Sequence, residues 1–314
     1  MTKPESRLVV VITGASSGVG FAIALAFARQ QALLVLASRN EIGLAKAAAE
    51  CRQAGAEVIF QSTDVTDFEA LARLRERAVE AYGRIDIWVN CAAVLLFGRF
   101  EDTPLEAFRR VIETNVLGYA NGARAAILQF RAQGCGTLIN VSSVLSLVGE
   151  PYASAYVTSK FAIRGLTTCL RQEASDVPDI RICAVLPPAV DTPIYQHAGN
   201  YMGRVARSIF PVYTADKVAK AVVRLARKPK REVVIGVFGR LITFAVKFAP
   251  GITEQAVARI GPRLQFTEQL CPPTNGNVLE STGLGYKISV GWLTYWKKLI
   301  FKRKPATLPS GARL

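Results

Sequence analysis

Three side chains near the middle of this sequence have the types and the spacing of an acid–base centre. Tyr156 and Lys160 are one helical turn apart, so both would leave the same face of a helix. An ammonium beside a phenol favours the phenolate, and we therefore expect Lys160 to lower the pKa of Tyr156. Ser143 lies upstream and offers a hydroxyl. Together these side chains predict a site that moves a proton near neutral pH.

A glycine-rich turn near the N-terminus predicts a phosphate-binding loop. Residues 13–20 read T-G-A-S-S-G-V-G, between a short apolar run and a stretch with helical apolar spacing. Small residues let the backbone approach a pyrophosphate, whose charge is favoured by the helix N-terminus that follows. The cofactor-binding candidates in this turn are Gly14, Ser16, Ser17, Gly18, Val19 and Gly20.

The glycine turn, the serine and the tyrosine–lysine pair, in this order, resemble the short-chain dehydrogenase/reductase family. The resemblance covers residues 8 to about 237. It implies that Tyr156 is the acid/base, that Lys160 tunes it and holds the nicotinamide ribose, and that Ser143 hydrogen-bonds the substrate oxygen. Asn115, in a T-N-V-L-G segment, matches the asparagine that links the lysine to bulk water. The family implies an enzyme that transfers a hydride between a nicotinamide cofactor and a carbonyl or alcohol.

The resemblance also assigns cofactor contacts beyond the glycine turn. These positions are Asp64, Val65, Asn90, Ala92, Pro187, Val190 and Thr192, in addition to Tyr156 and Lys160. Residues 90–93 read N-C-A-A where the family usually has N-N-A-G, and Asn90 keeps the side chain that ties neighbouring strands together. Ala93 replaces a glycine beside the cofactor. Pro188 replaces another glycine and has no backbone N–H, which stiffens the segment that follows.

The end of the second predicted strand indicates which nucleotide binds. An acidic side chain there would favour NAD, because it accepts hydrogen bonds from the ribose and repels a 2′-phosphate. Ser38 and Arg39 occupy this place, and a hydroxyl and a guanidinium suit a phosphate. We expect NADP to be preferred and NAD to remain usable. The alternative is that Arg39 is a solvated surface residue.

Strands and helices alternate along most of the chain, which predicts an α/β fold of the Rossmann type. The expected architecture is a doubly wound parallel sheet of about seven strands with a C-terminal helical extension. The predicted strands are residues 8–12, 33–37, 57–61, 85–90, 137–142, 180–186 and 232–237. The predicted helices are residues 18–30, 41–54, 69–81, 105–130, 154–174 and 215–226. The expected domains are a cofactor-binding domain over 1–238 and an extension over 239–314.

Two later regions break the alternation. Residues 188–213 are rich in proline, tyrosine and glycine, and we interpret them as a mobile lid. Residues 241–249 are an amphipathic segment that would line the pocket or a partner surface, and residues 263–284 have a loop-like composition.

Composition narrows the chemistry and the partners. The 314 residues include a single histidine, His197, which excludes a histidine-rich site, and we expect no metal. The six cysteines have no C-x-x-C spacing and are expected to be reduced thiols of an intracellular, cytoplasmic protein. The net charge is +15, but no nucleic-acid motif accompanies it. We therefore expect no nucleic-acid partner, and we expect a homo-oligomer.

The basic tail suggests a membrane surface as an alternative partner. Residues 286–304 place Trp292 and Trp296 on one helical stripe, flanked by lysines and an arginine. Such a helix suits an anionic membrane interface, whereas the same stripe could also pack on its own domain or on a second subunit. The location would then be cytoplasmic with peripheral attachment to a membrane.

The substrate side of the site is predicted to be mostly apolar. The candidate residues there are Ser143, Leu95, Leu145, Tyr152 and Tyr195. The sequence thus predicts an NADP-preferring oxidoreductase that interconverts an apolar alcohol and its ketone or aldehyde. The alternatives are a membrane-attached lipid- or sterol-type reductase and a non-catalytic NADP-binding regulatory or scaffold protein. A tuned tyrosine argues against the last of these.

Overall fold

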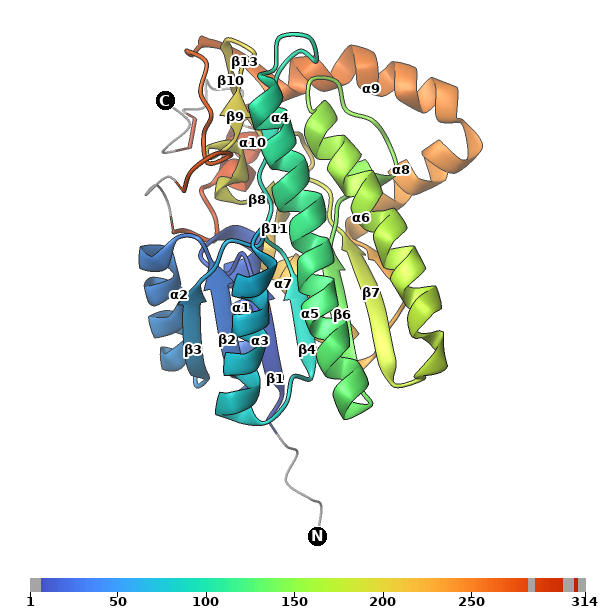
Figure 1. Cartoon of the computed structure of the whole chain (residues 1–314). Coiled ribbons are helices and arrows are strands. Elements are labelled where there is room, and N and C mark those ends of the chain that lie inside the picture. The colour runs from blue at the N-terminus through green and yellow to red at the C-terminus, as the bar shows by residue number, and fades with distance from the viewer. Residues whose placement is uncertain (1–6, 282–285, 302–307, 310–314) are drawn as a thin grey trace.

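A parallel sheet forms the centre of the computed structural model, which describes residues 7–281, 286–301 and 308–309. Its seven strands have the order β12-β7-β6-β4-β1-β2-β3. The chain enters in the middle of the sheet and builds outward to both edges, which confirms the predicted doubly wound arrangement (Figure 1). The strands are β1 (Val9–Thr13), β2 (Leu33–Ser38), β3 (Glu57–Ser62), β4 (Ile87–Asn90), β6 (Gly136–Val141), β7 (Ile180–Leu186) and β12 (Glu232–Val234).

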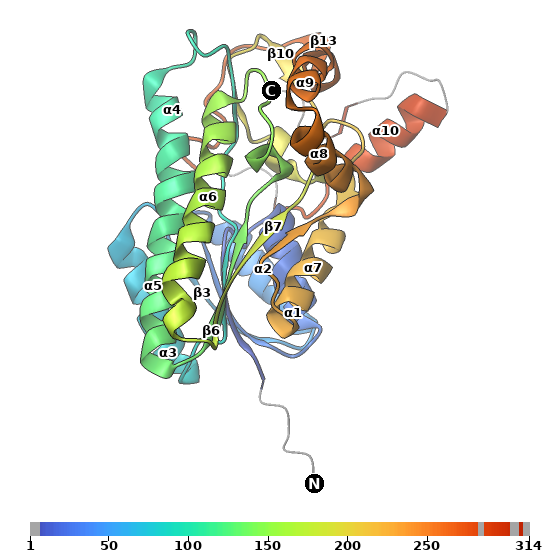
Figure 2. The same cartoon turned by 90° about the vertical axis from the view of Figure 1, so that its right-hand side faces the viewer.

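Helices cover both faces of the sheet and give the core three layers. Figure 2 shows the sheet nearly edge-on, with one group of helices on each side. One group is α1 (Gly18–Ala28), α2 (Glu41–Gln53) and α7 (Ala215–Arg227). The other is α3 (Phe68–Tyr82), α5 (Gly118–Gln133) and α6 (Ser154–Glu173).

Two apolar cores fill the spaces between these layers. Phe27 of α1 is fully buried in one core, and Trp88 of β4 is fully buried in the other. Because both faces of the sheet are covered, β1 is apolar at every position from Val9 to Ile12 instead of alternating. Burying a large apolar side chain stabilises the fold by about 1.5–3 kcal/mol. The strand ends therefore provide a rigid support for functional side chains.

The long helix predicted over residues 105–130 is interrupted in the structure. Helix α4 (Leu105–Ile112) continues into a π-helical turn, η1 (Glu113–Leu117), before α5 begins. The apolar spacing continues through this turn, so periodicity alone does not reveal it. Such wide turns occur often at functional sites, and this one contains the fully buried Asn115.

Residues 188–213 form a cap above the carboxyl ends of the strands. The short strand β8 (Val190–Asp191) pairs with β11 (Tyr213–Thr214), and β9 (Gly199–Asn200) pairs with β5 (Leu96–Phe97). A short 3-10 helix, η4 (Pro193–Tyr195), lies between β8 and β9. The predicted lid therefore has its own hydrogen-bonded framework, and its mobility stays a prediction.

The C-terminal extension begins earlier and contains more regular structure than predicted. Strand β12 ends at Val234, and helix α8 (Gly236–Phe248) starts at a glycine whose φ is +75°, so the strand predicted over 232–237 is too long. Helix α9 (Pro250–Gln265) follows and packs against α8 as a hairpin. Part of the segment predicted as loop is thus helix. Helix α9 continues directly into β13 (Phe266–Leu270), which pairs with β10 (Arg204–Ala206) of the cap.

The tryptophan stripe of helix α10 (Trp292–Phe301) packs on its own chain, which is one of the two interpretations left open above, so Trp292 and Trp296 are not presented to a membrane surface. Trp292 is 0% exposed and Trp296 is 5% exposed, in a cluster with Val205 and Val212 of the cap. The cap provides an apolar surface for the stripe, which the sequence could not show. Lys302, Arg303 and Lys304, which belong to the same predicted surface, lie outside the described residues.

A single carboxylate fixes the start of α10. Asp191 of β8 accepts hydrogen bonds from the backbone N–H groups of Gly291 and Trp292, at 3.0 and 2.9 Å, and from the hydroxyl of Ser289 at 2.7 Å. The carboxylate satisfies backbone donors that a helix N-terminus leaves without partners. Separately, none of the described helices combines the length and the apolar character needed to cross a bilayer.

Candidate active site

One cavity of about 610 Å³ lies above the carboxyl ends of the strands and brings most of the predicted site residues together. The glycine turn, the end of β2, the segment after β4, the end of β6 and helix α6 all contribute to its wall. The cap and the α8–α9 hairpin close the opposite side. Parallel sheets place strand carboxyl ends at one edge, and that is why residues distant in sequence converge here.

The glycine turn lines one end of the cavity. All six predicted residues of the turn are part of the wall, where helix α1 begins. Gly14 has φ of +71°, and a side chain there would approach the backbone of Ala92 to 2.7 Å, so only glycine fits. The N–H of Gly18 donates a hydrogen bond to the carbonyl of Lys287 at 3.0 Å. The C-terminal extension therefore reaches across the turn, which the sequence did not suggest.

The predicted nucleotide-selecting residues lie together at the same end. Ser38 and Arg39 both line the cavity. The guanidinium of Arg39 is half-buried and donates to the carbonyls of Asn277 and Leu279, at 2.8 and 3.3 Å, so Arg39 is not a freely solvated surface residue. Burial lowers its pKa, while the nearby Asp64 acts in the opposite direction.

Of the two cofactor contacts predicted after β3, only one residue reaches the cavity. Val65 lines it, whereas Asp64 does not. The carboxylate of Asp64 instead accepts hydrogen bonds from Arg110 and from the hydroxyl of Thr66. These hydrogen bonds hold the pKa of Asp64 below its usual value although burial acts to raise it. Asp64 fixes the loop after β3, and its contact with a cofactor stays a prediction.

Asn90 ties strands together, as the resemblance implies. Its side chain donates to the side chain of Asn140 on β6 at 3.0 Å and to the carbonyl of Tyr119 at 3.1 Å. Asn90 is buried and does not itself line the cavity, but the following residues Cys91, Ala92 and Ala93 do. The asparagine therefore positions the strand end that forms the floor of the site.

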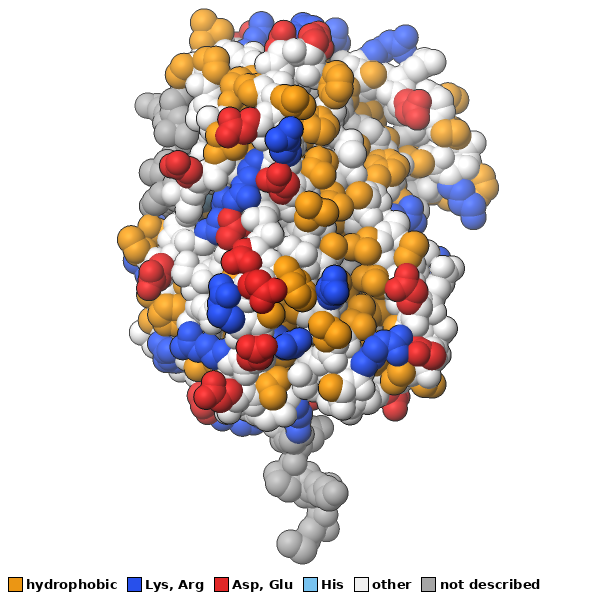
Figure 3. Space-filling model, viewed as in Figure 1, with side chains coloured by type: hydrophobic (Ala, Val, Ile, Leu, Met, Phe, Trp, Pro, Cys, Tyr) orange, Lys and Arg blue, Asp and Glu red, His pale blue; other side chains and the backbone are white. Residues whose placement is uncertain are grey.

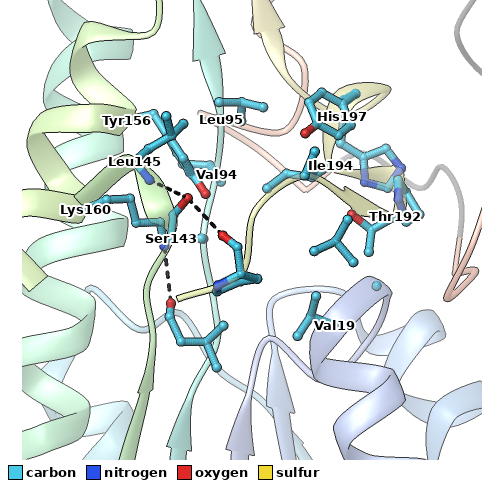
Figure 4. A pocket seen from close by; sticks show the side chains of 18 of the residues that line it. Val19, Val94, Leu95, Ser143, Leu145, Tyr156, Lys160, Thr192, Ile194 and His197 are labelled. Atoms are coloured by element: carbon cyan, nitrogen blue, oxygen red, sulfur yellow. Dashed lines mark hydrogen bonds between the residues drawn. The ribbon is translucent and has the colours of Figure 1, made fainter. Parts of the chain in front are cut away.

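Ser143, Tyr156 and Lys160 converge on one wall of the cavity (Figure 4). Ser143 caps a short 3-10 helix, η2 (Val144–Ser146), and its Oγ accepts from the N–H of Leu145 at 3.1 Å. Tyr156 and Lys160 leave the same face of α6, with Nζ 5.2 Å from the centre of the phenol ring. Lys160 Nζ also donates to the carbonyl of Val141 at 3.4 Å.

The ionisation of this trio differs from the sequence expectation. Burial raises the pKa of Tyr156, the charge of Glu150 adds to that effect, and a hydrogen bond with Ser143 opposes it. Burial also lowers the pKa of Lys160 to about 8. Lys160 lies over the ring rather than at the hydroxyl and is itself desolvated, so the predicted lowering of the tyrosine pKa is wrong here. Tyr156 is protonated at neutral pH and is ready to donate.

Asn115 is close to the trio but does not line the cavity. Its side chain exchanges two hydrogen bonds of 2.9 Å with the backbone of Val94 and donates to Ser159 Oγ at 3.0 Å. Ser159 is the neighbour of Lys160 on α6. Asn115 thus fixes the floor of the site against the catalytic helix, and its role in proton relay stays a prediction.

The cap provides the opposite wall. Val190 and Thr192 of the cap line the cavity, as does Pro187 just before the cap, and their contacts with a cofactor stay predictions. In Figure 4, Thr192, Ile194 and His197 face Ser143, Tyr156 and Lys160 across the open space, with Val19 of the glycine turn below. A flat ring between these walls would meet polar groups on one side and the cap on the other.

The substrate side is apolar, as predicted, but its residues are only partly those expected. Leu95, Leu145 and Tyr195 line the cavity. Tyr152 does not, because its ring packs against Phe266 of β13 at a centroid distance of 6.1 Å. The sequence missed the residues from α8 and α9 that complete this wall. They are Phe238, Ile242, Ala256, Val257, Ile260, Gly261, Leu264 and Gln265.

The missed residues differ in the signal that they left in the sequence. The amphipathic stretch at 241–249 pointed to Ile242, whereas nothing local marked α9 as part of the site. Glu150 lines the cavity as well, and its place between Gly149 and Pro151 looks like an ordinary surface turn. Among the described residues, no group of three or more histidine, cysteine, aspartate or glutamate side chains could hold a metal ion.

Comparisons with known proteins agree with this site. The model of the short chain dehydrogenase family matches residues 8–203. YxnA of Bacillus subtilis (strain 168), named an uncharacterized oxidoreductase, is 33% identical over 291 residues, which cover 91% of this chain and 82% of YxnA.

Two solved structures illustrate the likeness in fold. An alcohol dehydrogenase from the archaeon Thermococcus sibiricus, complexed with 5-hydroxy-NADP, is 31% identical with a TM-score of 0.64 and covers 73% of this chain and 96% of that chain. A short chain dehydrogenase from Mycobacterium paratuberculosis, bound to NAD, has a TM-score of 0.65 at 24% identity and covers 73% of this chain and 96% of that chain. The second likeness concerns the fold alone.

Proposed function

This chain belongs to the short chain dehydrogenase family of NAD(P)-dependent oxidoreductases, and we propose that it is an NADPH-preferring reductase of apolar ketones or aldehydes. The observation that carries the proposal is the convergence of Ser143, Tyr156 and Lys160 on a cavity whose far end is the glycine turn. A binding module without activity would have no use for a buried proton donor at this place.

The residues present fit a nicotinamide dinucleotide along the whole cavity. The glycine turn and the N-terminus of α1 suit the pyrophosphate, and Ser38 with Arg39 suits the adenosine end. At the other end, Lys160 would hold the nicotinamide ribose, and Val190 with Thr192 would hold the carboxamide. When bound, the reduced cofactor supplies the hydride for the carbonyl carbon.

The protein supplies the proton and the position. The Tyr156 hydroxyl donates its proton to the carbonyl oxygen, which becomes the alcohol oxygen. Ser143 donates a hydrogen bond to the same oxygen and stabilises the charge that develops there. Lys160 lies against the face of the tyrosine ring, and Asn115 holds the floor of the site against helix α6.

Reduction is the direction that the ionisation of Tyr156 favours. Reduction needs a protonated acid, whereas oxidation of an alcohol needs the phenolate. The raised pKa of Tyr156 maintains the protonated form across the neutral range. We therefore propose reduction of a carbonyl compound, rather than oxidation of an alcohol, as the reaction at neutral pH.

The preference for NADPH rests on Arg39 and Ser38. Ser38 and Arg39 stand at the end of β2 in place of an acidic side chain, and the planar guanidinium can bind a 2′-phosphate through two parallel hydrogen bonds. The solved structures similar to this chain include one with an NADP derivative and one with NAD, so the family fold alone does not decide the choice.

A substrate screen tests the proposed function directly. Purified full-length protein is mixed with NADPH or NADH and with ketones and aldehydes of graded chain length, and cofactor oxidation is recorded. We expect turnover that rises with chain length and is faster with NADPH, because the substrate wall is apolar. Tight cofactor binding without turnover of any carbonyl compound would instead support a non-catalytic binding protein.

A second copy of this chain is the partner that the surface of α5 and α6 suggests. Figure 3 shows apolar side chains gathered along the middle of this face, over these two helices. Leu117 just before α5, Leu128 on α5 and Phe161 on α6 are exposed. Soluble monomers seldom expose such a patch, and pairing two copies would cover it. Sedimentation of the wild type and of Phe161→Glu would show whether a dimer forms and dissociates.

Attachment to a membrane is a second candidate, and one observation favours it. The outer face of the α8–α9 hairpin exposes large apolar side chains beside basic ones, which suits an anionic lipid surface. The apolar residues are Val237, Leu241, Phe244, Phe248 and Ile252, and the basic residues are Arg240, Lys247 and Arg259. The same hairpin lines the cavity, so a lipid-like carbonyl could enter there. Flotation with anionic vesicles should be lost in Phe244→Asp if this holds.

A further inference from the structure

One acidic side chain in the substrate half of the cavity has no role in the mechanism above. Glu150 is the one carboxylic acid among the described residues that line the cavity. Its Oε1 is inaccessible to solvent and has no hydrogen-bond partner among the described residues. Leaving a buried polar atom without a partner is costly, and natural proteins rarely do so without a functional reason.

The position of Glu150 is on the substrate side and close to the proton donor. Burial, and then the charge of Glu150, raise the pKa values of both Tyr156 and Tyr195. These tyrosines lie on opposite walls, one on helix α6 and one on η4 of the cap. Burial also raises the pKa of Glu150 itself to about 7. Glu150 therefore lies in the substrate half of the cavity wall, near both tyrosines.

The loop that presents Glu150 is held firmly. Pro151 follows it and restricts its backbone, and Tyr152 has φ of +66°, a left-handed conformation that costs about 1–3 kcal/mol. This conformation persists because the carbonyl of Tyr152 accepts from the N–H of Gly98 at 2.8 Å, while its ring packs on Phe266. A firmly held loop that places a carboxylic acid in the wall of a mostly apolar cavity is suited to substrate recognition.

We propose that Glu150 is a specificity-determining residue that binds a hydrogen-bond donor, a hydroxyl or an ammonium group, on the substrate beyond its reacting carbonyl. This inference rests on the proposed reductase function. The substrate class is then an apolar ketone or aldehyde with one polar donor along its chain, rather than a simple hydrocarbon carbonyl. A site with a buried polar group discriminates strongly against analogues that leave the group unpaired.

The test compares three series of linear methyl ketones of graded chain length, which end in methyl, hydroxyl or ammonium. The full-length enzyme with NADPH is assayed as wild type, Glu150→Leu and Glu150→Gln. At one chain length, the wild type should have a higher kcat/KM for a ketone with a polar end than for the methyl-ended ketone. For this polar-ended ketone, Glu150→Leu should lower kcat/KM about 10-fold or more. Turnover of the methyl-ended ketone should fall less than turnover of the polar-ended ketone, so the ratio of the two kcat/KM values measures the contribution of Glu150.

Glu150→Gln distinguishes the two donors. The amide still accepts a hydrogen bond from a hydroxyl, so this variant should keep a hydroxyl preference and lose an ammonium preference. Equal losses for all three endings in Glu150→Leu would overturn the inference, because they would show a structural role. A wild type that never prefers a polar end would overturn it as well.

A binding measurement separates this inference from the proposed function. Calorimetry with the NADP⁺-loaded enzyme, which cannot reduce a ketone, gives the affinity for each ending without chemistry. Weaker binding of the polar-ended ketone in Glu150→Leu supports the role of Glu150 even if the kinetic assay shows no turnover and the reductase proposal fails. Equal affinities in wild type and variant would overturn the role of Glu150 while leaving the reductase proposal intact.

Discussion

The two walls of the cavity are built in different ways. The cofactor wall consists of short segments that each follow a strand of the sheet, such as Gly14 after β1, Arg39 after β2 and Ser143 after β6. The substrate wall depends mainly on segments that follow no strand of the central sheet, such as Ile242 of α8, Ile260 of α9 and Tyr195 of the cap.

The two walls therefore differ in how far the fold of the sheet determines them. A doubly wound sheet brings its strand ends to one edge, so the cofactor wall follows from topology and from a few small or polar residues. The substrate wall depends on how the extension packs back over that edge. We therefore expect changes on the first wall to remove chemistry and changes on the second wall to alter stability or substrate choice.

The largest effect that would test this division comes from two tyrosines in the same cavity. Tyr156→Phe removes only a hydroxyl and should lower kcat about 10²- to 10⁴-fold, because the proton donor is lost. Tyr195→Phe makes the same chemical change on the opposite wall and should keep kcat within a few-fold. Both variants should bind NADPH with nearly wild-type affinity in a fluorescence titration. Similar losses of kcat in both variants would contradict the assignment of chemistry to the first wall alone.

The sequence predicted the cofactor wall well for a physical reason. The apolar runs of β1, β2 and β4 and the glycine turn are local signals, and the alternation with helices implies the parallel order. The trio of Ser143, Tyr156 and Lys160 followed from spacing and resemblance. Their ionisation did not follow, because the pKa of Tyr156 depends on burial and on Glu150, which sequence spacing does not report.

The substrate wall was harder to predict because tertiary packing decides it. Helix α9 contains Pro262, and a proline inside a helical pattern usually ends or kinks the helix, whereas Pro250 at the first position of α9 is compatible with a helix start. The helical pattern that puts Trp292 and Trp296 on one stripe fits packing on a membrane and packing on a protein surface equally well. Only the apolar surface of the cap, with Val205 and Val212, determines that it is buried.

Helix α10 should matter for stability rather than for chemistry. Trp292→Ala should lower the free energy of unfolding by about 3–5 kcal/mol, because a fully buried indole leaves a cavity between α10 and the cap. Leu299→Ala, on the exposed side of the same helix, is the matched control and should cost much less. Denaturant unfolding gives both values. Equal stabilities of the two variants would mean that α10 does not dock in solution.

Arg39 should set the choice of nucleotide with a smaller effect. Arg39→Ala should weaken NADPH binding by about 1–3 kcal/mol, comparable to a lost hydrogen bond with a charged group, and should leave NADH binding almost unchanged. Arg39→Lys retains the charge without the planar guanidinium, and its affinity for NADPH should lie between the affinities of the wild type and Arg39→Ala. Because Arg39 also holds the carbonyls of Asn277 and Leu279, an equal loss for NADPH and NADH would show that it acts only through the extension.

A further effect on the first wall concerns pH. Burial lowers the pKa of Lys160 to about 8, so its ammonium is present below that pH and is lost as the pH rises through it. Since the charged form is assigned to the ribose and to Tyr156, kcat/KM for reduction should fall about tenfold per pH unit above about 8. Lys160→Arg retains its charge and should move the fall to higher pH. A rate that stays level to pH 10 (about two units beyond the shifted value) would contradict this assignment.

The transfer of hydride to a carbonyl carbon can be followed with an isotope. NADPH that carries deuterium at the transferable C4 position is incubated with the full-length enzyme and the best ketone from the screen, and the alcohol is analysed by mass spectrometry. The account predicts deuterium on the carbinol carbon in the wild type and in Tyr195→Phe, with almost no alcohol formed by Tyr156→Phe. An alcohol without deuterium, or labelled alcohol formed equally fast by Tyr156→Phe, would contradict it.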